Sequence, residues 1–302
     1  MIKHAFQIPD SKKIRLIINT DAKNEADDQF AIVHALLTPR FDIRGIIAAH
    51  FGERRTKHSM QESYDEIELL LNLMEIRDSV TVCKGAPTAI PDEKTAVGSE
   101  GADLIIKEAL ADDPRPLYVI FLGPITDLAA AYLLKPEIAG KLTAVWIGGG
   151  AWPNGEEEFN LSNDIDAANV VLESQIPIWI IPRSVYTTMR VGIAELHTRV
   201  RPYGKVGKYL YDQLVDFNMQ LQGSSHWPKG EMWSLGDSPA VSVLLDEHEY
   251  GYEWKPAPRI TKDMRYVHHQ KERLVRWYHF IDPRFTLEDM YAKLQIHYGS
   301  SN

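Results

Sequence analysis

Residues 14–37 read IRLIINTDAKNEADDQFAIVHALL and contain the features that decide the fold. The run from Ile14 to Thr20 is apolar and rich in β-branched residues, so it predicts a buried β-strand. A short polar loop follows, and Asp27 and Asp28 open a second apolar run with helical spacing. A buried strand that leads directly into a helix is the first half of a βαβ unit. The stretch therefore predicts an α/β fold.

The same alternation continues along the chain. Short apolar runs predict strands at residues 14–19, 43–48, 80–85, 117–122, 142–148 and 176–181. Longer runs between them predict helices at 27–38, 57–75, 99–111, 125–134 and 164–174. Continuous apolar strands are typical of a parallel sheet that helices cover on both faces. We expect a mostly parallel, doubly wound sheet flanked by helices, with ligands bound at the carboxyl ends of the strands where the strand order reverses.

The pattern changes after about residue 183. The later elements are predicted to be a helical zone at 192–222, a helix that begins near Ser238, a β-hairpin of 258–268 with 272–281, and a final helix at 286–297. No linker or repeat divides the chain. We therefore expect residues 1–302 to form a single domain with a C-terminal helical region and a β-hairpin.

Composition limits the classes of partner. Asp and Glu number 42 and Lys and Arg 33, which gives the 302-residue chain a formal net charge of -9. A nucleic-acid partner is not expected, because binding to a phosphate backbone needs clustered Lys and Arg. No apolar stretch approaches the roughly 20 residues that span a bilayer, and no hydrophobic signal region opens the chain. We therefore expect a cytoplasmic protein with no membrane partner. Cys83 is the single cysteine, which excludes an intrachain disulfide.

Four carboxylates, those of Asp21, Glu25, Asp27 and Asp28, lie close together after the first predicted strand. Helix capping and the helix dipole favour an acidic residue at a helix N-terminus, and this structural role accounts for one of them, such as Asp27. The others repel each other unless a cation or a proton compensates their charge. Hard carboxylate oxygens suit calcium or magnesium, and a flexible loop favours calcium. The cluster therefore predicts a metal site.

Two other segments offer oxygen ligands. Gly123 and Pro124 form a turn after the fourth predicted strand that can direct the Leu122 carbonyl outward, as in a calcium ligand. A Gly-Pro turn also occurs without any function. Asp237 precedes Ser238 and an apolar helix, so it is either a helix cap or a distant carboxylate that completes the metal shell.

Residues 148–171 read GGGAWPNGEEEFNLSNDIDAANVV. Three glycines after a strand let the backbone approach a ligand closely. The segment then presents a flat ring and hydrogen-bonding groups that suit sugar hydroxyls, from Trp152, Asn154, Glu158 and Asn160. Asp164 or Asn163 is expected to cap the next helix.

These segments, in this order, resemble the inosine-uridine-type nucleoside hydrolase family. Asp21, Asp27 and Asp28 match the family motif D-x-D-x-x-x-D-D. Its G-P-L-T-N-L-A turn is matched by Gly123-Pro124-Ile125-Thr126-Asp127-Leu128-Ala129. Its E-F-N and D-P-x-A-A segments are matched by Glu158-Phe159-Asn160 and Asp164-Ile165-Asp166-Ala167-Ala168, and its late helix start by Asp237. The resemblance covers roughly residues 14–245.

The resemblance implies a nucleoside-hydrolase-like fold and a Ca²⁺ ion whose ligands are Asp21, Asp28, the Leu122 carbonyl and Asp237. Asp21 would also be the general base that takes a proton from calcium-bound water. The groups that hold the ribose hydroxyls would be Asp27, Asn154, Glu158 and Asn160. A homo-oligomer, either a dimer or a tetramer, is also implied.

The chain departs from the family pattern at several positions. The loop between Asp21 and Asp27 is longer than the family's usual spacing, and Asn19 stands where the family has the first aspartate of its motif. Gly236 replaces a histidine that acts as a leaving-group acid in some members. These differences leave the metal half of the site intact and alter the half that meets the base.

The sequence does not identify the group that protonates the leaving base. His50 and Glu53 follow the second predicted strand, where the family usually has an asparagine. His50 and His226 are therefore candidates for a replacement acid, and a dedicated acid can also be absent. Aromatic rings can instead stack on the leaving group, although each can equally be loop packing; these are Trp152, Trp227 and Trp233.

We therefore predict calcium-dependent hydrolysis of the N-glycosidic bond of a ribonucleoside or related riboside, a small molecule that yields base and ribose. Nearby carboxylates suit the oxocarbenium-like state of such a reaction. One alternative is a hydrolase of another glycoside on the same fold, and a second is a non-catalytic calcium-dependent sugar-binding protein. A magnesium-dependent phosphohydrolase ranks lowest, because no convincing lysine or Ser/Thr phosphate-binding set accompanies the cluster.

Overall fold

The computed structural model describes residues 4, 6–221, 228, 230–247, 249–269 and 272–299. Its centre is an eight-stranded sheet of order β3-β2-β1-β4-β5-β6-β12-β9. The strands are β1 (Ile14–Thr20), β2 (Phe41–Ala48), β3 (Val82–Lys84), β4 (Leu117–Phe121), β5 (Thr143–Ile147), β6 (Ile178–Ile181), β9 (Tyr252–Pro256) and β12 (Leu274–Tyr278). All neighbours pair in parallel except β12 and β9, which are antiparallel. The predicted α/β fold with a mostly parallel sheet is confirmed.

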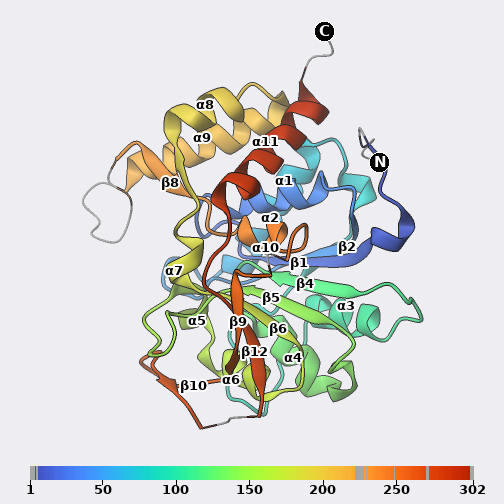
Figure 1. The fold of residues 1–302 in the computed structure, drawn as a ribbon, viewed down its shortest axis with the longest axis vertical. Helices are drawn as coiled ribbons and strands as arrows, with labels where there is room; N and C mark the ends of the chain where they lie inside the picture. The colour runs from blue at the N-terminus through green and yellow to red at the C-terminus, as the bar shows by residue number, and fades with distance from the viewer. Residues whose placement is uncertain are drawn as a thin grey trace.

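Helices cover both faces of this sheet (Figure 1). Leu16 and Ile18 of β1 point into one core, which contains residues of α1 (Asp28–Leu36), α2 (Ser59–Leu73), α9 (Gly204–Gln220) and α11 (Pro283–Tyr298). Ile17 points into the opposite core, which contains residues of α3 (Glu100–Ala109), α4 (Thr126–Leu134) and α6 (Ile165–Glu173). Alternate residues of a strand face opposite sides of the sheet. A strand that is apolar throughout must therefore be covered by helices on both faces.

The strand order places a reversal between β1 and β4. The chain runs outward from β1 through β2 to β3, returns to β4 on the other side of β1, and continues through β5 to β6. Loops that follow β1 and β4 therefore diverge to opposite sides and leave a crevice between them. Asp21 follows β1 and Leu122 follows β4, so both lie at this switch point.

The predicted helical zone at 192–222 is two helices in the described part of the chain, α8 (Ile193–Arg199) and α9. Pro202 lacks a backbone donor, and Gly204 has a positive φ of 68°. These two residues end one helix and start the next. The helix predicted near Ser238 is the short α10 (Pro239–Ser242), and the final helix is α11. Short elements connect the others: η1 (Asp10–Lys12), η2 (Arg77–Ser79), η3 (Pro136–Ile138), α5 (Phe159–Asn163), α7 (Arg183–Tyr186), β7 (Arg190–Gly192) and β8 (Met232–Ser234).

The C-terminal region contains antiparallel hairpins, but the predicted pairing of 258–268 with 272–281 is wrong. Residues within 258–268 pair with each other as β10 (Arg259–Ile260) and β11 (Tyr266–Val267). The strand β12 instead joins the central sheet between β6 and β9. Its Val275 and Trp277 lie in one core and its Tyr278 in the other. A strand buried on both faces belongs inside a sheet rather than in an exposed hairpin.

Among the described residues, no helix combines the length and the apolar composition that a bilayer crossing requires. The single domain of residues 1–302 stays a prediction.

Candidate functional site

A small, strongly acidic pocket lies at the switch point, and we call it the inner pocket. Its walls come from the loops that follow β1, β4 and β5, from α5 and α7, and from the segment before α10. The lining residues are Asp21, Asn24, Glu25, Asp27, Asp28, Leu122, Ile147, Glu158, Phe159, Asn160, Tyr186, Gly236 and Asp237. Most of the residues predicted from the sequence to bind metal or ribose are thus together in one place.

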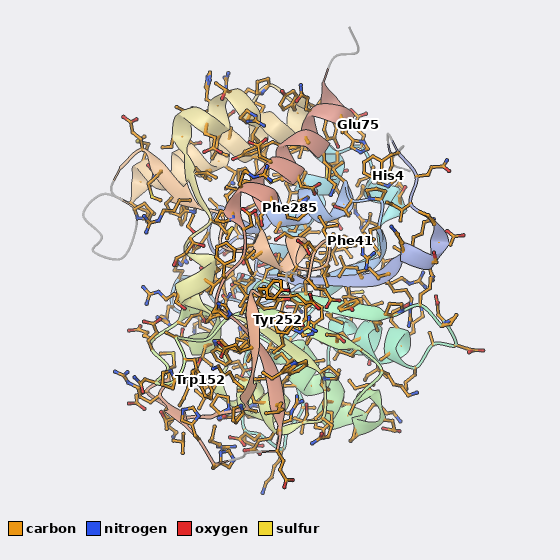
Figure 2. The ribbon with its side chains drawn as sticks, in the orientation of Figure 1. His4, Phe41, Glu75, Trp152, Tyr252 and Phe285 are labelled. Carbon is orange, nitrogen blue, oxygen red and sulfur yellow. The ribbon has the colours of Figure 1, made fainter. Side chains whose placement is uncertain are left out.

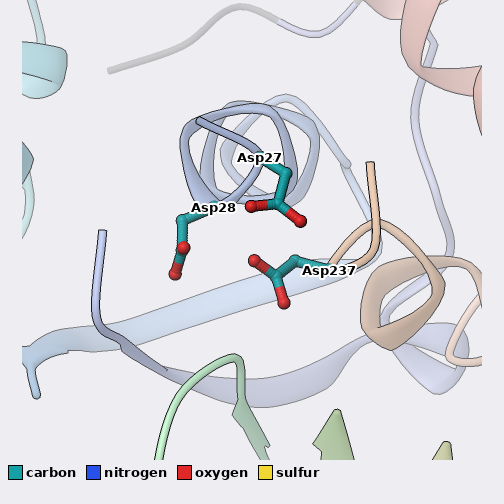
Figure 3. Close-up of side chains that lie close together, drawn as sticks. All are labelled: Asp27, Asp28 and Asp237. Carbon is teal, nitrogen blue, oxygen red and sulfur yellow. The ribbon is translucent and has the colours of Figure 1, made fainter. Parts of the chain in front are cut away.

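Three carboxylates in this pocket face one another. Asp27 and Asp28 come from the start of α1, and Asp237 comes from the segment before α10 (Figure 3). Each offers one oxygen, and the three oxygens lie within 4.8 Å of one another. Asp27 is the residue that precedes α1, yet its side chain makes no capping hydrogen bond. Its Oδ2 accepts instead from the Gly236 backbone N–H at 2.9 Å. Asp27 therefore occupies the N-cap position of α1 without the capping hydrogen bond that the sequence suggested, and its carboxylate contacts the segment before α10 instead.

Asp21 lies beside this trio with one oxygen unused. Its Oδ2 atom is buried and has no hydrogen-bond partner among the described residues. Its carboxyl packs directly against Gly123: a Cβ at that glycine would lie 2.8 Å from Asp21 Cγ. A residue larger than glycine after β4 would therefore displace the carboxylate. A buried acceptor without a donor is costly, so this atom is suited to a ligand.

The carboxylates titrate abnormally because they are buried together. Burial raises the pKa of Asp21 well above its ordinary value, and neighbouring charges, Asp28 first, raise it further. Burial and the charge of Asp28 raise the pKa of Asp27 to about 8. Burial also raises the pKa of Asp28 to about 6, while hydrogen bonds with Thr20 and Asp237 limit the rise. Without a cation, burial and mutual repulsion make it unfavourable for all three carboxylates to be ionised together. Hard oxygens, an unpaired acceptor and mutual repulsion together fit a Ca²⁺ or Mg²⁺ ion.

The Leu122 carbonyl lines the same pocket, as predicted for a metal ligand. It accepts a hydrogen bond from Asn160 Nδ2 at 2.7 Å, and the same amide donates to the Ile147 carbonyl at 2.9 Å. Asn160 therefore bridges the ends of β4 and β5. A carbonyl oxygen has two lone pairs, so Leu122 can accept from Asn160 and still face a cation.

Glu158 is held by four donors. Its carboxylate accepts from the backbone N–H groups of Gly149, Asn160 and Leu161 and from the Tyr186 hydroxyl, at 2.8 to 3.1 Å. It also caps α5. Burial raises its pKa, and the hydrogen bonds oppose that rise. Asp164 caps α6 through a 2.9 Å bond from the Ala167 N–H, which confirms one of the two predicted caps.

Three predicted residues are not brought to either cavity described here. Asn154 is exposed, and its backbone carbonyl accepts from the Tyr266 N–H at 3.1 Å. Trp152 packs 5.5 Å from Trp277 and 4.4 Å from His268, at the end of the molecule that carries β10 (Figure 2). Both residues are close to Glu158 in the sequence, and for that reason a contact with the sugar was predicted for both. Neither of them lines the inner pocket or the outer cavity.

His50 is the third. It is 1% exposed, and burial lowers its pKa to about 4. Its Nδ1 accepts from the Gly52 N–H at 3.1 Å, so its Nε2 carries the proton and donates to Thr126 Oγ1 at 2.9 Å. The Thr126 hydroxyl then donates to Asp164 Oδ2 at 2.7 Å. The neutral imidazole thus belongs to a structural hydrogen-bond chain.

A larger cavity of about 1090 Å³ adjoins the inner pocket, and we call it the outer cavity. The two share the residues Glu25, Asp27, Glu158, Phe159, Tyr186 and Gly236. Trp233 borders the outer cavity but is 1% exposed and packs 5.5 Å from Phe217 in the core, so its role is packing and not stacking on a leaving group. His226 and Trp227, the other candidates for the base side, lie outside the described residues.

The sequence reasoning missed Tyr186 and the arginines of the outer cavity. Tyr186 ends α7, the short helix that directly follows β6. Arg54 and Arg55 follow β2, and Arg183 and Arg190 follow β6. All of them come after strands of the parallel sheet, so applying the carboxyl-end rule to every strand would have found them.

Comparisons with known proteins agree with this geometry. A family model described as inosine-uridine preferring nucleoside hydrolase matches residues 16–279. The pyrimidine-specific ribonucleoside hydrolase RihA of Salmonella arizonae is 24% identical over 220 residues, which are 67% of this chain and 70% of that protein.

Two solved structures share the fold. The purine-preferring ribonucleoside hydrolase from Gardnerella vaginalis aligns with a TM-score of 0.76 and 20% identity. A plant nucleoside hydrolase, the PpNRh1 enzyme, aligns with a TM-score of 0.75 and 19% identity. Each alignment covers 93% of this chain and 98% of the other.

Proposed function

The chain belongs to the inosine-uridine preferring nucleoside hydrolase family and hydrolyses the N-glycosidic bond of ribonucleosides, and from this premise we propose that its reaction depends on calcium and uses Asp21 as general base. One feature of the inner pocket supports this most directly. The Oδ2 atom of Asp21 is buried without a partner, beside three carboxylates whose oxygens lie within 4.8 Å of one another. Such a group is poised to accept a proton or to bind a cation.

Four groups of the inner pocket would hold the ion: the carboxylates of Asp21, Asp28 and Asp237 and the Leu122 carbonyl. A calcium ion there would lower the pKa of water, so that hydroxide is available near neutral pH. The ion would also offset the repulsion that raises the pKa values of these carboxylates.

The ribose would be held by Asp27, Glu158 and Asn160, which line the inner pocket together. One oxygen of Asp27 already accepts from Gly236, which leaves the other for a sugar hydroxyl. Glu158 is fixed by four donors, so its orientation does not have to change when the sugar binds. The exposed Asn154 is not included in this set.

The reaction then needs one water. Its oxygen forms a bond to the anomeric carbon while the C–N bond breaks, and the electron pair of that bond leaves with the base. Asp21 takes one proton of the water, the departing base takes one proton from solvent, and Asp21 returns its proton to solvent, so that one water is consumed and no net proton is gained or lost. Positioned proton transfer of this kind contributes about 10²- to 10⁴-fold to a rate. The surrounding carboxylates stabilise the positive charge that develops on the sugar.

Among the described residues, none of the groups that line the inner pocket or the outer cavity is a histidine. We propose that the base lies in the outer cavity against Phe159, whose ring favours an aromatic leaving group by packing.

Reducing-sugar release from a panel of nucleosides, measured with and without a chelator, tests this function. We expect release from at least one nucleoside and its loss on chelation, with recovery when calcium is restored. If no nucleoside is cleaved while ribose raises the thermal unfolding midpoint, the protein is a sugar-binding protein instead. If only other glycosides are cleaved, the substrate assignment is wrong and the site assignment stands.

We also propose a homo-oligomer, a dimer or a tetramer, which the resemblance to the family supports, and a cytoplasmic location, which rests on the sequence features described above. Light scattering coupled to size-exclusion chromatography measures the mass in solution. A mass equal to the 34.3 kDa chain would contradict the oligomer.

A further inference from the structure

The strand β9 is an open edge of the central sheet. Among the described strands it pairs with β12 alone, so its other side has no ladder partner there. The opposite edge strand, β3, has three residues, whereas β9 has five. A very short edge strand is one way in which proteins prevent a sheet from pairing with another chain. The edge at β9 lacks that protection, so a further strand can add there.

The hydrogen bonds to β12 show which backbone groups of β9 face outward. The Ala257 N–H donates to the Arg273 carbonyl at 2.8 Å, and the His279 N–H donates to the Gly251 carbonyl at 2.8 Å. Bonded and unbonded positions alternate in an antiparallel ladder, and the register between these two bonds has no shift. The odd-numbered residues of β9 therefore bond to β12, and the even-numbered residues turn their backbone groups outward.

The outward backbone groups belong to Tyr252, Trp254 and Pro256. None of them takes part in a backbone hydrogen bond with a loop or helix of the described chain. Pro256 has no N–H to leave unpaired, which is why proline is tolerated at an edge. Trp254, at the centre of the strand, presents both an N–H and a C=O outward. A strand needs this pair of groups at its centre to hydrogen-bond with its own copy about a twofold axis.

The charged side chains of β9 match this twofold arrangement. If a second β9 runs antiparallel with Trp254 opposite Trp254, Glu253 of each copy lies opposite Lys255 of the other. These positions are non-hydrogen-bonded pairs, in which the side chains approach most closely. Within one chain Glu253 and Lys255 already form an ion pair. Two copies would therefore form a ring of four alternating charges, and opposite charges directly across a ladder stabilise the pairing.

Charges and proline on an edge strand usually oppose pairing, and here they select one register. Pro256 removes a donor at one end of the strand and leaves the centre free. Parallel pairing in the same register would place Glu253 beside Glu253 and Lys255 beside Lys255, and like charges across a ladder destabilise it. The antiparallel pair about Trp254 brings opposite charges together instead.

Apolar side chains beside this edge are exposed. Tyr250 is 86% exposed, Trp254 56% and Leu274 44%. Leu274 of β12 is paired with Pro256, so it lies on the same face of the sheet as Trp254. The Arg276 guanidinium carbon lies 5.5 Å from the centre of the Trp254 ring and restrains it. Large exposed aromatic groups of this kind are typical of the centre of a protein interface.

We infer that β9 is the interface with a second copy of this chain, paired antiparallel about Trp254 so that two eight-stranded sheets join into one. The inference rests on the homo-oligomer proposed above and names its interface. The interface is isologous, so each pair of chains contains the Glu253–Lys255 contact twice. Neither of these residues nor Trp254 lines the inner pocket or the outer cavity, so the pairing leaves the site accessible.

Charge reversal tests the interface. Glu253→Lys would place two lysine side chains opposite each other at both symmetric positions, and Lys255→Glu would do the same with two glutamates. Each variant should raise the dissociation constant of the pair by about tenfold or more, because two attractive contacts become repulsive. Analytical ultracentrifugation over a range of protein concentrations measures this constant. The mass should fall by half at concentrations where the unaltered protein is still associated.

Mixing the two variants gives the sharpest result. A pair that contains one chain of each variant has opposite charges at both positions again. An equimolar mixture of the Glu253→Lys and Lys255→Glu proteins should therefore recover the mass that each has lost alone. The double variant with both substitutions in one chain should also associate. Damage to the fold would not be repaired by mixing, so recovery separates a lost contact from a misfolded chain.

Lys205→Glu is the matched control. Lys205 lies on α9 and forms an exposed ion pair with Glu75, so its reversal also breaks a surface ion pair. The mass of this variant should equal that of the unaltered protein. A circular dichroism spectrum and a thermal unfolding midpoint for every variant show that the chains are folded.

Three outcomes would overturn the inference. If the unaltered protein is an oligomer and Glu253→Lys associates as tightly as Lys205→Glu, the interface lies elsewhere and the proposed oligomer stands. If the single variants dissociate but their mixture does not recover, Glu253 and Lys255 do not face each other. If the unaltered protein is a monomer at every concentration, the oligomer and its interface are both wrong, while reducing-sugar release still decides the proposed hydrolysis.

Discussion

Asn19 donates a hydrogen bond of 2.9 Å from its Nδ2 to Asp127 Oδ2, and this joins the end of β1 to the start of α4. The family pattern has an aspartate at the first position and an asparagine at the second, so the two residue types are exchanged here. Asp127 also accepts from the Ala86 N–H at 2.9 Å and from Ser99 Oγ at 2.6 Å. Two departures from the family pattern therefore form a single compensated change.

Asn19→Asp alone should be strongly destabilising. It would place two buried carboxylates in contact, so that one of them must take up a proton, and the hydrogen bond that the amide gives to a charged group, about 1.5–3 kcal/mol, is lost. The double variant Asn19→Asp with Asp127→Asn restores one amide and one carboxylate and should recover most of that loss. Urea unfolding of the single and double variants measures the coupling. If the two single effects simply add in the double variant, the exchange is not compensated.

Asp21→Asn should abolish turnover while ribose still binds. The amide cannot take the proton of the attacking water, and loss of a positioned base lowers a rate by about 10²- to 10⁴-fold. Reducing-sugar release measures the first effect, and the thermal shift caused by ribose measures the second. Asp216→Asn serves as control, because Asp216 is exposed on α9 and should leave the rate unchanged. Full activity of Asp21→Asn would remove Asp21 as the base.

In the protein treated with a chelator, the thermal unfolding midpoint should fall as pH rises. Burial and neighbouring charge raise the pKa of Asp27 to about 8, above the ordinary value of 3.8 that applies in the unfolded chain. The folded state therefore binds more protons than the unfolded state, and its stability decreases as pH rises towards the folded pKa. Between about pH 7 and about pH 8, where unfolded histidine is already largely neutral, the thermal unfolding midpoint of the chelated protein should drop.

Calcium should restore the midpoint, and more so at the higher pH. Asp27→Asn provides the comparison, because an amide does not titrate and the drop should be smaller. A chelated protein whose midpoint is flat over this interval would show that the carboxylates do not carry these protons.

Tyr186→Phe should weaken substrate binding more than it slows the chemical step. The Tyr186 hydroxyl donates to Glu158 Oε1 at 2.8 Å, and both residues line the inner pocket. Loss of one buried hydrogen bond to a charged group costs about 1.5–3 kcal/mol, so KM should rise about tenfold or more. Steady-state kinetics separate the two parameters. A fall in kcat with unchanged KM would instead place the hydroxyl in the chemical step.

Restoring the family histidine at Gly236 should not restore a leaving-group acid. A Cβ at Gly236 would lie 3.0 Å from Tyr186 Cδ2 and 3.3 Å from Asp27 Oδ2, so the Tyr186 ring occupies the room that such a side chain needs. Gly236→His alone should therefore be less active than the unaltered protein, and combination with Tyr186→Ala should recover part of the activity. A more active single variant would contradict this steric relationship.

The central fold was accessible from the sequence because its signals are local. Each parallel strand is apolar on both faces, and each is followed by a helix, so the order of elements implies the sheet. The pairing of β12 was not accessible in this way. Its apolar pattern fits a hairpin as well as an interior strand, and only packing against β6 decides between them.

In the site, too, some residues could be predicted from local sequence signals and others could not. That Asp21, Asp28, Leu122 and Asp237 line one pocket was predictable, because three of these residues follow strands or precede helices at the switch point of the sheet; their roles as metal ligands stay a prediction. Closeness to Glu158 in the sequence does not give the direction of a side chain, so Asn154 and Trp152 were placed on the wrong face. Tyr186 could be found by its position after β6 but not by its residue type, because its hydrogen bond to Glu158 joins residues 28 positions apart.

The bond from the Gly236 N–H to Asp27 joins residues 209 positions apart in the chain. A ribosome must therefore make more than three quarters of the protein before Asp237 can approach Asp28. The late strand β12, which lies between β6 and β9, comes later still. A nascent or prematurely terminated chain would expose the early aspartates without their distant partner. The acidic site is therefore assembled late in synthesis, from segments at both ends of this sequence order.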